Sequence, residues 1–207
     1  MIKYTRPVTN PSGNALLVQA YPQIKRDFGA LVEPFVLHAV EPRLLAGVWM
    51  ATRETELVGS VRREIKEAVA ATVSLLNQCT YCVDAHTMLL HATTAHRIST
   101  AISNKQDDLI QDAAIRRIVA WANVNRSPGD PLLQKPPFSE VEAPEIIGTA
   151  LVFHYINRMV DIFLDETPLP SNRGWLKGTL KRMAGWYFSR AARQRKIAGT
   201  SLALLPA

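Results

Sequence analysis

The two cysteines of the chain lie three residues apart in the motif Cys79-Thr-Tyr-Cys82, and a histidine follows at His86. On a helix that begins near Asn77, these three side chains share one face, because residues three, four and seven apart lie one above the other. Such a set could be a redox-active thiol pair with a base, part of a zinc site, or two buried thiols. Haem attachment is excluded, because a haem-attachment motif has its histidine directly after the second cysteine, whereas His86 lies four residues after Cys82.

The residues alone leave open which cysteine is the more reactive. Cys79 falls in the first turn of the expected helix, where free N–H groups and the helix dipole favour an anion and lower a thiol pKa. His86 lies one turn beyond Cys82 and could hydrogen-bond its sulfur or accept its proton. The position at the helix end therefore favours Cys79 as the more reactive thiol, and the nearby base favours Cys82.

A second helix is expected before the motif, over residues 57–76, with Asn77 and Gln78 as a short polar break. Two helices joined by a short turn run antiparallel, so Glu67, ten residues before Asn77, and His86, nine after it, lie at nearly the same level. If they face each other, the carboxylate orients the imidazole and the imidazole serves the thiol. The first helix has an apolar stripe of Val61, Ile65, Ala68, Val69, Thr72, Val73 and Leu76, with Arg62, Arg63 and Lys66 on its other side.

Helical periodicity dominates the chain and sustained alternation is missing, which predicts an all-α fold. Residues 1–13 have the composition of an irregular arm, and Pro22 and Pro34 are expected to interrupt the helical region that follows. Further helices are expected from Pro42, from about Cys79 to Ala95, over 107–124, and from a capping box at 139–142 to an end at Pro168 and Pro170. Residues 125–138, with four prolines, are expected to form a loop.

Charge is concentrated at the end of the chain. Residues 171–207 carry eight basic and no acidic residues, so the first 170 residues have a net charge of −2 although the whole chain has +6. We therefore expect no nucleic-acid-binding domain. The amphipathic extension 171–207 should pack on the body or on a neighbouring subunit, with contact to an anionic membrane surface as the alternative. No secretory signal or membrane span is evident, which predicts a cytoplasmic protein, where CxxC motifs are catalytic or metal-binding.

The combination of Glu67, Cys79-x-x-Cys82 and His86 resembles the alkylhydroperoxidase AhpD core of the carboxymuconolactone decarboxylase-like superfamily. EAVAATVSLLNQCTYCVDAH is similar to the peroxidase-related branch, and the resemblance covers about residues 40–165. It implies an AhpD-like helical domain over 1–170, with a central helix hairpin that carries the CxxC motif and a basic C-terminal helix added beyond it. Thiol-dependent reduction of a hydroperoxide is the implied activity.

The resemblance also implies the role of each site residue. Cys82 attacks the peroxide, Cys79 closes the disulfide, and Glu67 and His86 form the proton relay. No metal or organic cofactor is implied, the thiol reductant stays unknown, and a homo-oligomer, a trimer or a hexamer, is expected.

Other functions stay open at this point. Tyr81 stands where AhpD proper has a second histidine, which bears on the proton network and on the peroxide rate. A disulfide reductase or redox-sensing module that acts on a partner protein is one alternative function, and a zinc-stabilised helical binding protein is another. The lactone decarboxylases of the superfamily generally lack the CxxC motif, which argues against their activity here.

Overall fold

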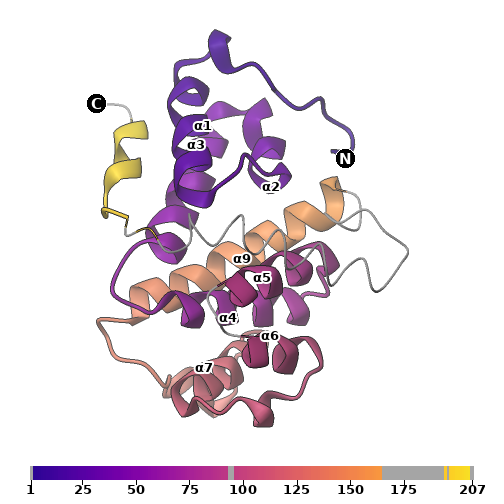
Figure 1. The fold of residues 1–207 in the computed structure, drawn as a ribbon, viewed down its shortest axis with the longest axis vertical. Helices are drawn as coiled ribbons and strands as arrows, with labels where there is room; N and C mark the ends of the chain where they lie inside the picture. The colour runs from indigo at the N-terminus through magenta and orange to yellow at the C-terminus, as the bar shows by residue number, and fades with distance from the viewer. Residues whose placement is uncertain (1, 93–95, 165–193, 195, 206–207) are drawn as a thin grey trace.

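A computed structural model describes residues 2–92, 96–164, 194 and 196–205. These residues form helices, and the β-bridge among them pairs Ile2 with Leu164. The long helix α9 crosses the middle of the molecule, with α1, α2 and α3 on one side of it and α6 and α7 on the other (Figure 1). The principal helices are α1 (Ala15–Phe28), α2 (Glu33–Val36), α3 (Pro42–Thr52), α4 (Arg63–Leu76), α5 (Thr80–Ala92), α6 (His96–Ser103), α7 (Ala113–Asn123), α8 (Pro131–Gln134) and α9 (Ala143–Phe163).

Helix α4 is the centre of the core. Every residue from Ile65 to Ser74 is buried, including Lys66 of the predicted polar side, whereas Arg62 of that side is exposed. Small residues such as Ala68, Ala70 and Ala71 let α5, α7 and α9 pack closely around it. By length and composition alone α9 could cross a membrane, but its buried residues pack on α4, as in a core helix.

The start of α4 differs from the expected position. The periodicity predicts a helix from residue 57, whereas α4 begins at Arg63 after a bend in which Gly59 has φ 108°. Glu145 of α9 accepts hydrogen bonds from the backbone N–H groups of Ser60 (2.7 Å) and Val61 (3.2 Å). A Cβ atom on Gly59 would collide with the carboxylate of Glu145. A tertiary contact from a distant helix therefore interrupts the helical pattern here.

Between α3 and this bend lies the π-helical turn η3 (Arg53–Leu57), which continues α3 without a break. Pro42 opens α3 at its first turn, as predicted, and Glu41 caps it. The expected interruption at Pro22 is wrong, because α1 continues through it. Its missing N–H would have bonded the carbonyl of Val18, which lies on an exposed side of α1 where water can replace the bond.

Other boundaries shift by local capping. The segment 107–124 divides into the 3₁₀ turn η4 (Asp107–Leu109) and α7, which the side chain of Asp112 caps. The loop 125–138 contains the short helix α8. The predicted capping box forms between Ser139 and Glu142, one turn before α9. Helix α9 ends at Phe163, and Pro168 and Pro170 lie outside the described residues.

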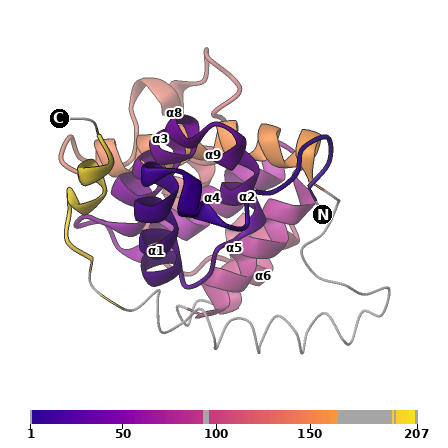
Figure 2. The same ribbon diagram turned by 90° about the horizontal axis from the view of Figure 1, so that it is seen from above.

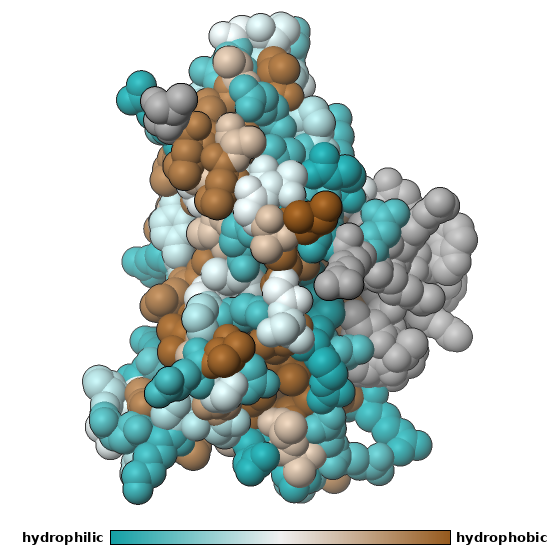
Figure 3. Space-filling model, turned by 90° about the vertical axis from the view of Figure 1, so that its left-hand side faces the viewer, coloured by the Kyte–Doolittle hydropathy of each residue, from teal (hydrophilic) through white to brown (hydrophobic). Residues whose placement is uncertain are grey.

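Most of the predicted basic extension, 171–207, also lies outside the described residues. The 3₁₀ turn η5 (Thr200–Leu204) lies beside α1 and α3 (Figure 1 and Figure 2). Glu54 of η3 accepts hydrogen bonds from the N–H of Gly199 and the hydroxyl of Ser201. The face that carries η5 mixes hydrophobic and hydrophilic side chains (Figure 3), and Ile197 is 79% exposed there. The described end of the chain is thus tied to the body at η3.

Candidate active site

The CxxC motif lies at the start of α5, directly after the turn that joins it to α4. Gln78 adopts the left-handed conformation (φ 61°), and the N–H of Cys79 donates to the carbonyl of Ser74 (3.0 Å). The carbonyl of Cys79 accepts the bond from the N–H of Val83 (2.9 Å), so Cys79 is the cap of α5 rather than a residue of its first turn. The predicted helix hairpin is therefore present, with α5 beginning at Thr80.

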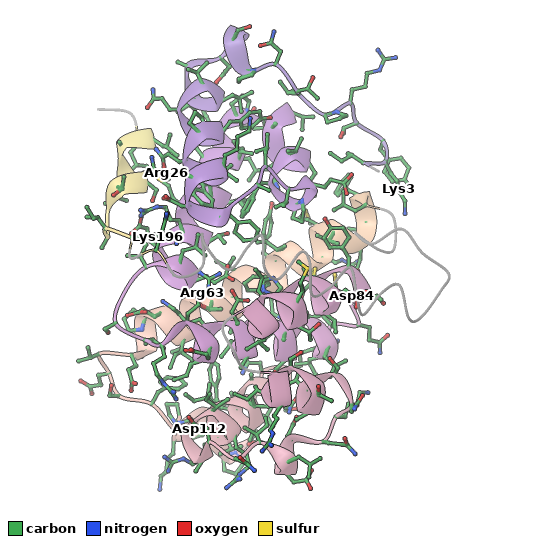
Figure 4. All side chains as sticks on the ribbon, in the orientation of Figure 1. Lys3, Arg26, Arg63, Asp84, Asp112 and Lys196 are labelled. Atoms are coloured by element: carbon green, nitrogen blue, oxygen red, sulfur yellow. The ribbon has the colours of Figure 1, made fainter. Side chains whose placement is uncertain are left out.

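Glu67 and His86 face each other across this hairpin. The Nδ1 atom of His86 lies 2.8 Å from Oε2 of Glu67, and both side chains are buried. The other carboxylate oxygen of Glu67 accepts a hydrogen bond from Nε of Arg63 (2.7 Å), near the centre of the molecule (Figure 4). The ring of His86 also packs edge to face against Phe153, with centroids 4.3 Å apart. The carboxylate thus fixes the imidazole and directs Nδ1 toward itself, which leaves Nε2 for proton exchange.

Glu56, in the π-helical turn η3, is a member of this cluster that the sequence did not single out. It is fully buried, and its Oε1 atom lies 3.7 Å from Nδ1 of His86 and 3.4 Å from Nη2 of Arg63. Its second oxygen, Oε2, has no hydrogen-bond partner. Nothing in the spacing marks Glu56, because it reaches the site through an irregular turn eleven residues before Glu67.

The protonation of this cluster follows from its contacts. Burial opposes ionisation of Glu67, but the charge of Arg63 and the bond from His86 outweigh it and lower the pKa of Glu67 to about 2. Burial alone would lower the pKa of His86, yet the hydrogen bond to Glu67 and the nearby negative charges raise it. Burial and the charge of Glu67 raise the pKa of Glu56 to about 7, against the opposing charges of Arg63 and His86. The cluster therefore combines a carboxylate, an imidazole whose protonated form is favoured, and a carboxyl group that titrates near pH 7.

The two cysteines are free thiols with different acidities. The hydrogen bond from the Cys79 thiol lowers the pKa of Cys82, and the charge of His86 and a hydrogen bond to Asn157 act in the same direction against burial. The same bond to Cys82, together with burial, raises the pKa of Cys79. The helix end therefore does not make Cys79 the more acidic thiol, and Cys82 is the one that ionises first.

Asn157 of α9 joins the cysteines to the α4–α5 turn. Its amide donates to the hydroxyl of Ser74 (3.0 Å), and its oxygen accepts from the amide of Asn77 (2.9 Å). The side chain of Asn77 also meets Nδ1 of His154 at 3.0 Å. His38 lies in another part of the core, 3.1 Å from the hydroxyl of Tyr155. His154 is thus linked to the α4–α5 turn through Asn77, and the side chain of His91 is outside the described part.

A cavity of about 320 Å³ adjoins the reactive groups. Because Cys82 is only 2% exposed, a reactant reaches its sulfur through this cavity. Tyr81, which stands in place of a second histidine, also faces the cavity, and burial raises the pKa of its phenol so that it stays protonated. The wall is largely aromatic and aliphatic, and its chemically active members are Glu56, Tyr81, Cys82 and His86.

The geometry gives little support to a zinc site built on the cysteines. Among the described residues, the group of three metal-capable side chains is Glu56, Glu67 and His86, within 4.8 Å of one another, and it includes neither cysteine. The guanidinium of Arg63 already contacts both carboxylates of that group. A cation would have to displace this built-in positive charge.

No family model matches the chain. Over 200 residues, which is 97% of its length, it is 35% identical to an alkyl hydroperoxide reductase of Mycobacterium tuberculosis. The chain spans 57% of the length of that curated relative.

Solved structures share the fold at low sequence identity. An AhpD core structure, of a peroxidase-related protein from Ralstonia eutropha, matches 79% of this chain and 92% of its own with a TM-score of 0.65 and 18% identity. The debrominase Bmp8 in complex with 2,3,4-tribromopyrrole matches 88% of this chain and 98% of its own, with a TM-score of 0.67 and 19% identity. The same helical fold therefore occurs in proteins described by different reactions.

Proposed function

We propose that the chain is a thiol-dependent hydroperoxide reductase that cycles Cys79 and Cys82 between dithiol and disulfide, because it is similar in sequence to an alkyl hydroperoxide reductase and in fold to an AhpD core structure. The observation that supports this most is the buried His86–Glu67 pair beside two free thiols of unequal acidity, of which the more acidic, Cys82, lines a cavity. Carboxylate, imidazole and thiol then take the roles of orienting group, base and nucleophile.

In the first step the Cys82 thiolate attacks the terminal oxygen of the hydroperoxide R–O–O–H. The O–O bond breaks, Cys82 becomes a sulfenic acid, and the alkoxide RO⁻ leaves and is protonated to the alcohol. His86, positively charged through its contact with Glu67, stabilises the thiolate before the attack. The relay thus favours the reactive thiolate form of the nucleophile.

In the second step Cys79 attacks the sulfur of the Cys82 sulfenic acid. The S–S bond forms, the S–O bond breaks, and the hydroxyl leaves as water with the proton of the Cys79 thiol. The raised pKa of Cys79 keeps that proton in place until this step. An external dithiol or a protein thiol then reduces the disulfide, which returns two thiols to the site.

Peroxide consumption with dithiothreitol as the reductant tests the proposal. We expect Cys82→Ser to abolish consumption, and Cys79→Ser to accumulate one sulfenic acid per chain, trapped with dimedone and located by mass spectrometry. A sulfenic acid on Cys79 in the Cys82 variant, and none on Cys82 in the Cys79 variant, would reverse the assignment. A wild-type protein that consumes no peroxide would refute the activity.

A disulfide reductase that acts on a partner protein is less well supported. Both sulfurs are buried, and a folded partner would have to bring its own disulfide into the cavity. Metal analysis of the purified protein tests the zinc-stabilised alternative directly.

The assembly and location of the protein belong to the same proposal. We expect a homo-oligomer in the cytoplasm, a trimer or a hexamer, in which exposed apolar residues of α9 such as Leu151 (64% exposed) become buried. The domain 1–170 would carry the activity and the extension 171–207 would not. Light scattering of the full chain measures the assembly.

A further inference from the structure

Glu56 is a buried acid that the proposed peroxide cycle does not use. It is 0% exposed and lines the same cavity as Cys82 and His86. Its Oε2 atom lacks a hydrogen-bond partner. A buried polar atom without a partner is costly, and such atoms persist where they serve a reaction or meet a ligand.

The groups around Glu56 favour its neutral form. Glu67 and Arg63 face it from α4 and His86 faces it from α5, while α9 contributes the ring of Phe153 to the same cavity. Arg63 and His86 supply two positive charges, which Glu67 and the Cys82 thiolate already balance. A second carboxylate at Glu56 would add an uncompensated negative charge to a buried site. At neutral pH part of the Glu56 population therefore carries a proton, beside the cavity that Cys82 also lines.

The first step of the cycle needs such a proton. Cleavage of the O–O bond releases an alkoxide, which is a strong base, into a cavity with a largely apolar wall. We propose that Glu56 is the general acid of the reaction and donates its proton to the alkoxide as the Cys82 thiolate takes the terminal oxygen. This inference rests on the proposed function, and it adds a catalytic residue to it.

The protons balance over the cycle. When Glu56 has given its proton to RO⁻, the His86 imidazolium, which lines the same cavity, replaces it through Nε2, the nitrogen that Glu67 does not hold. His86 is then neutral, and it recovers its proton from the Cys82 thiol that reduction of the disulfide regenerates. The proton that leaves Cys82 at the start of each cycle is thus the one that reaches the alcohol of the next.

Oxidants with different leaving groups distinguish a general acid from a residue that only supports the fold. With tert-butyl hydroperoxide the leaving group is an alkoxide and must be protonated, whereas with peracetic acid it is acetate and needs no proton at neutral pH. We expect Glu56→Gln to lower the single-turnover rate of Cys82 oxidation by tert-butyl hydroperoxide about 100-fold, and that by peracetic acid by no more than about threefold. The full chain is used, and the rate is read from the loss of free thiol.

Glu54→Gln is the matched control. Glu54 lies in the same π-helical turn but binds the chain end at Gly199 and Ser201, so the same chemical change there should leave the ratio of the two rates unaltered. Glu56→Asp, which keeps a carboxyl group, should restore part of the tert-butyl hydroperoxide rate.

Each remaining outcome contradicts the inference in its own way. Equal losses with both oxidants in Glu56→Gln would show that Glu56 only supports the fold of the site. No loss with either would assign the donated proton to His86. If the wild-type protein oxidises Cys82 with neither reagent, the proposed function fails before the role of Glu56 is reached.

Discussion

Lys66 and Glu67 are consecutive residues of α4, both are buried, and they belong to two different charged clusters. The ammonium of Lys66 donates to the carbonyl of Val58 (2.5 Å) and to Glu145 (2.8 Å), whose carboxylate also accepts the N–H groups of the bend before α4. Each of these charges therefore meets an opposite charge or a hydrogen-bond partner. The Lys66 cluster is closed, and it fixes α4 against α9.

The Glu67 cluster is built differently although it starts one residue later. It holds two carboxyl groups, an arginine and a histidine, leaves one oxygen of Glu56 without a partner, and opens onto the cavity that Cys82 also lines. In this cluster the pKa of Glu56 is raised and that of Glu67 is lowered. In the other cluster the single positive charge of Lys66 is paired with the single negative charge of Glu145. The comparison shows that buried charge stabilises the fold where it is fully paired, and becomes available for chemistry where one group is left over beside a cavity.

The largest effect should come from Glu67→Gln. The imidazole of His86 loses the carboxylate that raises its pKa, so the Cys82 thiolate loses its counter-charge. We expect the peroxide rate at neutral pH to fall about 1,000-fold and the Cys82 pKa to rise. The pH dependence of thiolate absorbance measures that pKa. A variant with an unchanged Cys82 pKa would show that the hydrogen bond from Cys79 alone sets its acidity.

Lys66→Met tests the closed cluster. Because Glu145 would keep its charge without the ammonium, we expect a loss of about 3 kcal/mol in the free energy of unfolding. Urea denaturation measures it. The peroxide rate per folded chain should stay within about twofold of the wild type and the Cys82 pKa should be unchanged, since Lys66 does not contact the cysteines. A large loss of rate in a folded Lys66→Met protein would mean that the two clusters are coupled through α4.

The Glu67 cluster should also make the free energy of unfolding depend on pH, through Glu56. Glu56 titrates near pH 7 in the folded protein against an ordinary value of 4.5, so the unfolded chain releases this proton first and folding loses stability as the pH rises between these values. Glu56→Gln removes that loss. The difference in unfolding free energy between variant and wild type should therefore grow from about pH 5 to about pH 8, by roughly 2.5 kcal/mol. A difference that shrinks with pH would mean that Glu56 is ionised in the native state.

Tyr81→Phe should have the smallest effect. The phenol faces the cavity but belongs to neither charged cluster, and burial keeps it protonated. We expect the peroxide rate to change by no more than about twofold. A tenfold loss would add the phenol to the set of proton-transferring groups and would explain why this chain has no second histidine between its cysteines.

The sequence predicted the all-α fold, the α4–α5 hairpin and the equal level of Glu67 and His86, because these depend on local periodicity and on spacing across a short turn. Spacing did not determine whether the two side chains face each other, because that depends on the rotation of each helix. It did not predict the start of α4 or the burial of Lys66, because both depend on Glu145, which lies about 80 residues further along the chain. It also missed Glu56. An acid in a π-helical turn has no periodic pattern that would assign it to a face, and only the packing of η3 against α9 shows where it points.

The position of the Glu56 side chain depends on the number of residues in the π-helical turn at Arg53–Leu57. A single-residue deletion there would rotate α3 about 100° relative to the bend and α4, and would shift it about 1.5 Å along the axis. The deletion would not change the spacing between Glu67, the two cysteines and His86, so a search for their sequence motif would still find it. Glu67 lies eleven residues after Glu56 in this chain. In any related sequence that shares the cysteine motif, a glutamate eleven residues before the one that matches Glu67 would indicate that the buried acid is retained.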